Sequence, residues 1–242
     1  MFPIKDNIPH RESPFVTWLL ILINGVVFLL ETSLPPEALQ RLLMHYGMVP
    51  ARYTDPLWAL SRGLSPVDPL PFLTSIFLHG GWWHFISNMW TLWLFGDNVE
   101  DCMGHFRFLV FYLLCGLAAG FLHFFFNPGS TLPTIGASGA IAGVMGAYFV
   151  MFPTARVITL VPIFFIPYFI EIPAVFYLGL WFLSQLFSGV FSLMLPAGAG
   201  GIAWWAHVGG FLFGIFVLPL FRKRRRSYRP FYADEYFCRN FF

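Results

Sequence analysis

Long apolar stretches without a charged residue dominate this chain and alternate with short turn-rich segments. Residues 108–155 contain no Lys, Arg, Asp or Glu, and neither do residues 172–221. Each stretch is about twice the ~20 residues that an α-helix needs to cross a bilayer core of about 30 Å, so each predicts two membrane helices. Residues 127–130 and 196–201 divide the two stretches, because their Asn, Pro, Gly and Ser content is typical of turns.

Two earlier apolar segments bring the number of expected membrane spans to six. The interrupted segment 157–171 contains Pro162, Pro167 and a single charge at Glu171, so we expect an interfacial connection there, with a seventh helix as the alternative. The segment 32–80 is rich in Pro, Leu and aromatic residues, which favours a partly embedded loop. The pattern therefore predicts an all-α integral membrane protein with six transmembrane helices, near residues 14–31, 81–96, 106–126, 136–152, 172–194 and 202–221.

The composition agrees with a membrane protein and excludes two other classes. Apolar side chains make up 57% of the 242 residues and charged side chains only 11%, whereas soluble domains carry about 25% charged residues. There is too little polar surface for a soluble fold. A net charge of only +2 also argues against nucleic acid as a partner.

The distribution of basic residues predicts the orientation of the chain. With six spans both termini share one side, and eleven of the fourteen Lys and Arg residues fall on that side. Because basic loops tend to remain in the cytoplasm, we expect both termini to be cytoplasmic. This gives a cytoplasmic N-terminal segment at 1–13, a helical domain at 14–221 and a basic and aromatic cytoplasmic tail at 222–242.

Four polar side chains are expected at a similar depth in three different spans. Ser138 lies near the outer end of span 136–152, and His207 lies near the outer end of span 202–221. His84 and Asn88 are four residues apart near the outer end of span 81–96, so they share one helix face. Polar side chains inside a membrane are costly and indicate a functional site.

Small residues repeat every four positions beside two of these side chains, which predicts close contact between spans 136–152 and 202–221. Such stripes let two helix backbones approach each other in a membrane. The same interface would bring the hydroxyl and the imidazole together. The stripes are Gly139, Gly143 and Ala147 on one helix, and Ala206, Gly210 and Gly214 on the other.

These residue types fit nucleophilic catalysis. A serine hydroxyl needs a base to remove its proton, and His207 is a base that works near neutral pH, so Ser138 and His207 form a candidate dyad. His84, Asn88 and the backbone N–H of Ser138 can stabilise an oxyanion. No metal site is expected, because HExxH is absent and His79 and His84 point in different directions on a helix.

Two other classes of protein were weighed against this enzyme. A haem-binding bundle that uses His84 and His207 would leave Asn88 and the glycine-flanked Ser138 unexplained. A transporter or channel would be expected to carry carboxylates or broken helices at the membrane midplane, and the sequence shows neither feature.

The motifs together resemble the rhomboid family of intramembrane serine proteases, and the resemblance extends over about residues 14–221. Segment 77–101 is also similar to bacterial members. The order and spacing of three motifs carry the likeness: His79-x4-His84-x3-Asn88, Gly136-Ala137-Ser138-Gly139, and Ala206-His207-Val208-Gly209-Gly210 with Gly214.

The resemblance implies a protease whose nucleophile is Ser138 and whose general base is His207, with His84 and Asn88 lining the oxyanion hole. It implies single-span transmembrane proteins as substrates, a bacterial inner membrane as location, and no cofactor. His79 would belong to the structural or water-retaining surroundings. The alternative is a catalytically inactive rhomboid-like protein that binds transmembrane clients.

Two departures from the family pattern concern the surroundings of the dyad. Many members have an adjacent Trp-Arg pair in the loop after the first span, whereas here Trp58 and Arg62 are separated. Some members carry Tyr four residues after the serine, where this chain has Ala142. If an aromatic ring supports the imidazole, Trp204 or Trp205 would have to supply it.

Overall fold

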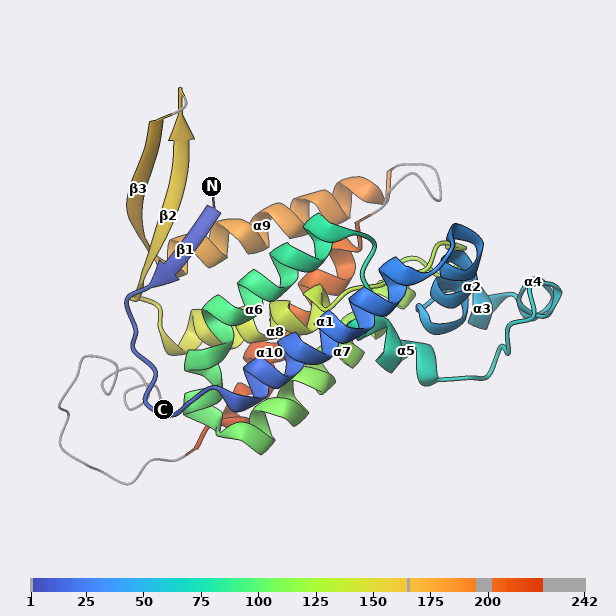
Figure 1. Cartoon of the computed structure of the whole chain (residues 1–242), viewed down its shortest axis with the longest axis horizontal. Coiled ribbons are helices and arrows are strands. Elements are labelled where there is room, and N and C mark those ends of the chain that lie inside the picture. The colour runs from blue at the N-terminus through green and yellow to red at the C-terminus, as the bar shows by residue number, and fades with distance from the viewer. Residues whose placement is uncertain (1, 165, 195–201, 224–242) are drawn as a thin grey trace.

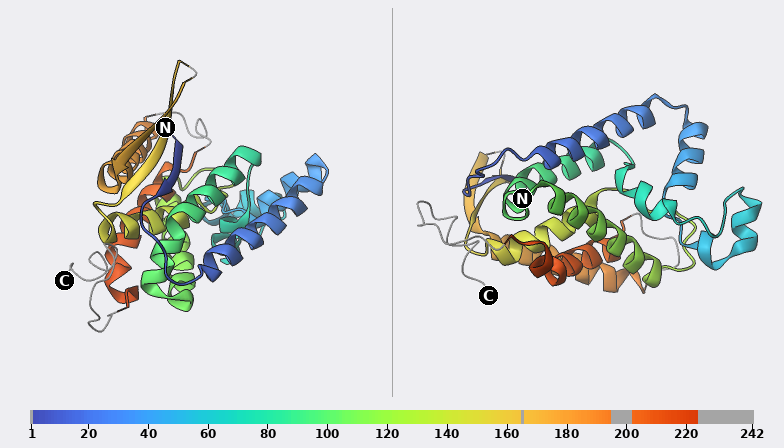
Figure 2. Two further views of the ribbon diagram at one scale, coloured as in Figure 1. Left: turned by 60° about the vertical axis from the view of Figure 1, so that its left-hand side comes forward. Right: turned by 90° about the horizontal axis from the view of Figure 1, so that it is seen from below.

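Six long helices form the body of the computed structural model, which describes residues 2–164, 166–194 and 202–223. They lie side by side at the positions of the six predicted spans (Figures 1 and 2). The boundaries of five helices agree within two residues at each end, but α6 continues seven residues beyond the predicted end at 96. The predicted turn at 196–201 and the tail from Arg224 onward lie outside the described residues. The helices are α1 (Phe15–Ser33), α6 (Trp82–Met103), α7 (His105–Phe126), α8 (Ser138–Met151), α9 (Ala174–Ser192) and α10 (Trp204–Phe221).

Four of these helices, α1, α7, α9 and α10, are long and apolar enough to cross a membrane. Helix α8 is apolar but has only 14 residues. Helix α6 has 22 residues and carries Asp97, Glu100 and Asp101 towards its C-terminal end. The chain is therefore a mostly helical, multi-pass membrane protein, and the number of six crossings stays a prediction.

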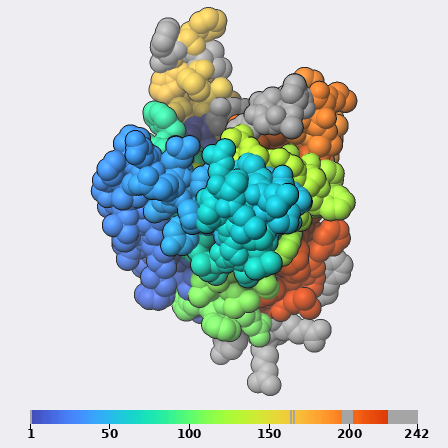
Figure 3. Space-filling model, turned by 90° about the vertical axis from the view of Figure 1, so that its right-hand side faces the viewer, coloured from blue at the N-terminus to red at the C-terminus, as the bar shows by residue number. Residues whose placement is uncertain are grey.

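The segment between α1 and α6 folds into short helices at one end of the bundle, and it covers the middle of the face in Figure 3. Arg52 holds it together: this side chain is 3% exposed and donates to the carbonyl oxygens of His45 and Ser65 and to the carboxylate of Asp68. The short helices are α2 (Pro36–Tyr46), α3 (Ala51–Thr54), α4 (Pro56–Ser61) and α5 (Leu70–Thr74), followed by a 3₁₀ turn, η1 (Ser75–Phe77).

Helices α8 and α10 pack more extensively on each other than any other pair, as the small-residue stripes predict. A Cβ atom at position 210 would lie 1.9 Å from the carbonyl oxygen of Gly139, and one at position 214 would lie 2.2 Å from that of Gly143. Only glycine allows backbones to approach this closely. This contact fixes the relative position of the two helices.

A three-stranded antiparallel sheet lies at the opposite end of the bundle from α2–α5 (Figure 1). Its strands are β1 (Phe2–Asp6), β2 (Arg156–Ile163) and β3 (Ile166–Pro173), in the order β1-β2-β3. The segment expected to be an interfacial connection is thus a hairpin. Its prolines disfavour a helix, but Pro162 and Pro167 pair close to the hairpin turn, beyond the last pairing of β2 with β1.

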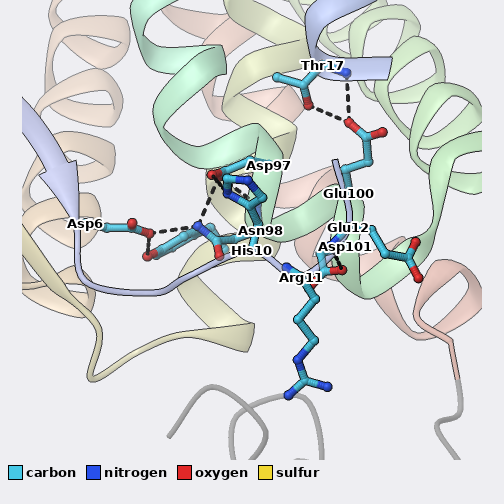
Figure 4. A network of polar contacts seen from close by, with 10 residues as sticks. Asp6, His10, Arg11, Glu12, Thr17, Asp97, Asn98, Glu100 and Asp101 are labelled. Atoms are coloured by element: carbon cyan, nitrogen blue, oxygen red, sulfur yellow. Dashed lines mark hydrogen bonds and ion pairs between the residues drawn. The ribbon is translucent and has the colours of Figure 1, made fainter. Parts of the chain in front are cut away.

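A polar network ties the N-terminal segment to the C-terminal part of α6 (Figure 4). Glu100 is 1% exposed and accepts hydrogen bonds from the N–H groups of Val16 and Thr17, each at 2.8 Å, and from the Thr17 hydroxyl at 2.7 Å. The first N–H groups of a helix have no intrahelical acceptor. A carboxylate from a distant helix therefore caps α1 and fixes its position against α6.

Strand β1 is held by Asp6, whose carboxylate accepts from the Asn98 amide at 3.0 Å and from the Tyr148 hydroxyl. Burial raises the pKa of Asp6 from 3.8 to about 7, and the nearby Asp97 adds to the rise while the Tyr148 hydrogen bond opposes it. The docked strand then binds a proton that a free strand would release. Docking is strongest at low pH, weakens as the pH rises from about 4 to about 7, and is constant above that.

We expect a spin label at Lys5, which is exposed on β1, to become more mobile between pH 5 and pH 8. Asp6→Asn removes the titrating carboxyl, so it should remove most of the pH dependence of the label's electron paramagnetic resonance spectrum. A spectrum that is equally pH-dependent with and without Asp6→Asn would contradict this explanation.

Candidate active site

Ser138 and His207 meet at the N-terminal ends of α8 and α10. The Ser138 Oγ atom lies 2.8 Å from the His207 Nε2 atom, which is hydrogen-bonding distance. Ser138 is the first residue of α8, and His207 is in the first turn of α10, one position after Ala206 of the small-residue stripe. The close approach of these two helices thus brings the hydroxyl and the imidazole together.

Both side chains line an open cavity of about 890 Å³ at the end of the bundle that also carries α2–α5. His84 and Asn88 line the same cavity from α6, so all four residues singled out in the sequence contribute to it. Other parts of its wall come from the segment after α7 and from the start of α10. A partly open cavity of this volume has room for water beside the serine–imidazole contact.

Asn88 presents a hydrogen-bond donor without an acceptor. Its side chain is 5% exposed, and its Nδ2 atom has no hydrogen-bond partner within the described chain. A buried donor left unpaired costs about 1–3 kcal/mol, so such a group is unusual unless it has a partner during function. An anion that forms in the cavity would be such a partner.

His84 supplies a second donor, and its protonation state follows from its neighbours. The Gly80 N–H donates to the His84 Nδ1 atom at 3.3 Å, so the neutral ring carries its proton on Nε2. That atom faces Gly136, where a Cβ would lie only 2.7 Å from it. Gly136 also has a φ of 126°, a conformation that favours glycine. Both features require glycine two residues before Ser138.

The start of α8 adds further donors beside Ser138. No side-chain hydrogen bond caps this helix, and the N–H groups of its first turn lack intrahelical acceptors. The helix dipole gives this end a partial positive charge, which favours an anion there. Together with His84 and Asn88, these groups can stabilise negative charge close to the Ser138 hydroxyl.

Gln185 of α9 is a site residue that the sequence analysis missed. Its Oε1 atom lies 2.7 Å from the His207 Nδ1 atom, on the side of the ring opposite Ser138. The signal available in the sequence was a lone amide side chain within the uncharged stretch 172–194. Serines at 184, 188 and 192 lie beside Gln185 on an otherwise apolar helix, and such a stripe does not by itself show whether position 185 faces inward.

Neither Trp204 nor Trp205 stacks flat on the His207 imidazole. Trp205 stacks on Phe126, with ring centroids 3.7 Å apart. Trp204 meets the His207 ring edge-on at 6.3 Å, and Trp181 lies 5.9 Å from it at a tilt of 37°. No ring stacks flat on the imidazole within the described residues, and the Gln185 hydrogen bond is its closest support.

Two further histidines surround the site. His79 is 2% exposed, and its backbone N–H donates to the Glu31 carboxylate at 3.2 Å. Its ring packs edge-on against the ring of His84. This position fits the structural surroundings that the resemblance implies. His123 of α7 is also buried and lines the cavity. In the described part of the chain, no group of three or more His, Cys, Asp or Glu residues is arranged to hold a metal ion.

The fold and the site define a class: a multi-pass helical membrane protein in which two tightly packed helices bring a serine and a histidine together at one end of the bundle. Comparison with known proteins gives the family. Residues 68–224 match the Rhomboid domain, and the chain belongs to the rhomboid family. This confirms the resemblance and the helical membrane fold inferred from the sequence.

The curated relatives include organellar members of this family. The chain is 30% identical to the mouse Presenilin-associated rhomboid-like protein, mitochondrial, over 207 residues. This alignment covers 82% of this chain and 46% of the mouse protein. It is 28% identical over 152 residues to the Saccharomyces cerevisiae Rhomboid protein 1, mitochondrial, covering 60% of this chain and 40% of the yeast protein. It is also 28% identical over 141 residues to the Arabidopsis thaliana Rhomboid-like protein 11, chloroplastic, covering 58% and 43%. The chain thus spans less than half the length of these relatives.

Proposed function

We propose that this chain is an intramembrane serine protease that hydrolyses peptide bonds in or near transmembrane segments of other membrane proteins. The observation that carries the proposal is the 2.8 Å contact between the Ser138 Oγ and His207 Nε2 atoms at the wall of an open cavity. Membership of the rhomboid family supports it. Neither the contact nor the family alone would specify the reaction as well as the two together.

In the proposed reaction His207 is the general base and Ser138 is the nucleophile. The Nε2 atom takes the hydroxyl proton while Oγ attacks the carbonyl carbon of the scissile peptide bond. The imidazolium then gives that proton to the leaving amine, which departs and leaves an acyl ester on Ser138. Water, activated by the same imidazole, hydrolyses the ester and restores the hydroxyl.

The negative oxygen of the tetrahedral intermediate is proposed to bind between the donors around Ser138. These are the His84 Nε2–H, the Asn88 amide and the unsatisfied N–H groups at the start of α8. Donors fixed before the reaction stabilise charge without reorganisation, and each such donor is worth about 10²–10³-fold in kcat. The unpaired Asn88 amide supports this role, because an oxyanion would supply its missing acceptor.

The proposed substrates are single-span membrane proteins whose helix unwinds near the site, because the peptide bonds of a stable helix are shielded from attack. The proposed location is a bacterial inner membrane with cytoplasmic termini and the cavity towards the outer side. The bias of Lys and Arg supports this orientation. The helix ends that line the cavity lie at the opposite end of the bundle from strand β1, which agrees with this orientation (Figure 1).

Labelling with a fluorophosphonate tests the proposal directly. An activated serine attacks the phosphorus atom and expels fluoride, so the purified protein in lipid should form a covalent adduct that mass spectrometry maps to Ser138. His207→Ala should abolish the adduct, because the base is missing. Absence of labelling in a folded protein, or labelling elsewhere, would overturn the proposal. A folded but unlabelled protein that still binds transmembrane segments would instead be the inactive, client-binding alternative.

A further inference from the structure

The amide of Gln185 is bonded at both ends, and this arrangement links α9 to the proposed dyad. Gln185 is 7% exposed. Its Oε1 atom lies 2.7 Å from the His207 Nδ1 atom, and its Nε2 atom donates to the Ser184 Oγ atom at 2.9 Å. The Ser184 hydroxyl in turn donates to the carbonyl oxygen of Trp181 at 2.6 Å. A chain of hydrogen bonds therefore runs from the α9 backbone to the imidazole.

This series of hydrogen bonds fixes which end of the Gln185 amide faces the His207 ring. The single proton of the Ser184 hydroxyl is engaged by the Trp181 carbonyl, so towards Gln185 the hydroxyl can only accept. The amide nitrogen must then point to Ser184, and the amide oxygen must point to His207. Ser184 thus decides the orientation of a side chain whose two ends have nearly the same shape.

The orientation of the amide in turn decides the tautomer of the imidazole. Because Oε1 can only accept a hydrogen bond, the Nδ1 atom that faces it must carry the proton. A neutral imidazole has one ring proton, so Nε2 is left with a free lone pair, and it lies 2.8 Å from the Ser138 hydroxyl. A flipped amide would donate to Nδ1 and place the proton on Nε2, which could then no longer accept the serine proton.

We propose that Gln185 is a positioning residue that holds His207 in the tautomer and ring orientation of a general base, and that Ser184 locks the Gln185 amide in the required direction. This inference rests on the proposed function of the Ser138–His207 pair. The amide does for this pair what a carboxylate does in a Ser-His-Asp triad, but it introduces no charge into the membrane-embedded bundle. Its carbonyl dipole also favours the imidazolium that forms when Nε2 takes the proton.

Substitutions at position 185 separate a positioning role from a packing role. Gln185→Leu keeps the size but removes the acceptor, and we expect kcat to fall by about 10–100-fold with little change in KM, because the wrong tautomer removes the base and not the binding surface. Gln185→Glu restores an acceptor that cannot flip. It should recover most of the lost activity and move the acid limb of the kcat/KM profile to higher pH, since a carboxylate beside the ring stabilises the imidazolium.

The lock is tested at Ser184. Ser184→Ala frees the amide to flip, so a mixture of both tautomers should lower kcat by a smaller factor of about 2–10. The matched control is Ser188→Ala, one turn further along α9, because the hydrogen bonds of Ser184, Gln185 and His207 do not involve Ser188; it should leave kcat within about twofold. Thermal unfolding of every variant shows that the comparison is made between folded proteins.

A second readout does not depend on cleavage. The ¹⁵N shifts of the imidazole nitrogens distinguish the two tautomers, and the His207 signals are assigned by their loss in His207→Gln. We expect the proton on Nδ1 in the parent protein and a shift towards Nε2 in Gln185→Leu. The positioning role is overturned if Gln185→Leu keeps the parent kcat and tautomer, or if Gln185→Glu is as impaired as Gln185→Leu with an unmoved acid limb.

The outcomes also separate the two proposals. If the parent protein cleaves and its Ser138 reacts with the fluorophosphonate while Gln185→Leu behaves as the parent does, only the role of Gln185 falls. If the parent tautomer is as expected but Ser138 is unreactive and nothing is cleaved, the protease function falls, and with it any catalytic purpose of the tautomer.

Discussion

Replacing Ser138 by alanine is expected to lower the rate of cleavage of a single-span test substrate by at least about 10,000-fold. The substitution removes the nucleophile and leaves only the binding surface and the oxyanion donors, and in serine proteases loss of the nucleophile or base costs up to about 10⁶-fold in kcat. His207→Ala should be similarly severe. The double variant should lose little more than either single one, because both residues act in one proton transfer.

The measurement is cleavage of the test substrate by the purified protein reconstituted in lipid vesicles. Ser87→Ala is the matched control, because Ser87 also lines the cavity but its hydroxyl donates to the carbonyl oxygen of His84 and does not contact the dyad. It should retain activity within a few-fold. Residual cleavage by Ser138→Ala above about one per cent of the parent rate would show that another residue is the nucleophile.

Gly210→Ala is expected to destabilise the folded protein by about 2–3 kcal/mol, although the same change usually stabilises a helix by about 1 kcal/mol. The added Cβ would lie 1.9 Å from the carbonyl oxygen of Gly139. Since this neighbour is backbone, it cannot rotate away, and α8 must move from α10. Activity should fall by about 100-fold as well, because a separation of about 1 Å between nucleophile and base is enough for such a loss.

The matched control is Gly179→Ala on α9. Its Cβ would have Phe149 as nearest neighbour at 3.7 Å, which is an ordinary contact. It should therefore be neutral or slightly stabilising in the same unfolding measurement in detergent. If the two alanine variants have equal unfolding midpoints and equal activity, the close contact between α8 and α10 does not hold the site together.

The parts that could be predicted from the sequence are those in which the membrane constrains each residue separately. Charged residues are so costly in lipid that their absence marked the long helices, and polar residues are so costly that Ser138, His207, His84 and Asn88 stood out. Glycine stripes indicated which two helices touch. These signals are local, so a single sequence contains them.

The parts that could not be predicted depend on distant partners. Strand β2 pairs with residues 2–6, and its apolar, proline-interrupted sequence gives no sign of that partner. Gln185 reaches His207 only because α9 is rotated to face it inward, and the polar residues beside it on this helix do not by themselves reveal that rotation. In both cases the missing information was the pairing between segments, which is set by the packing of the whole bundle.

The order of the sheet, with β1 beside β2, has a consequence for biosynthesis. Residues 2–6 are translated long before β2, the strand that they pair with, which emerges only after α8 has been made. Until then β1 exposes an unsatisfied edge to whatever meets the nascent chain, and such edges are prone to association. The β1–β2 pairing can therefore form only after α8 has been synthesised, and a reagent that traps residues 2–6 during translation would leave the sheet incomplete.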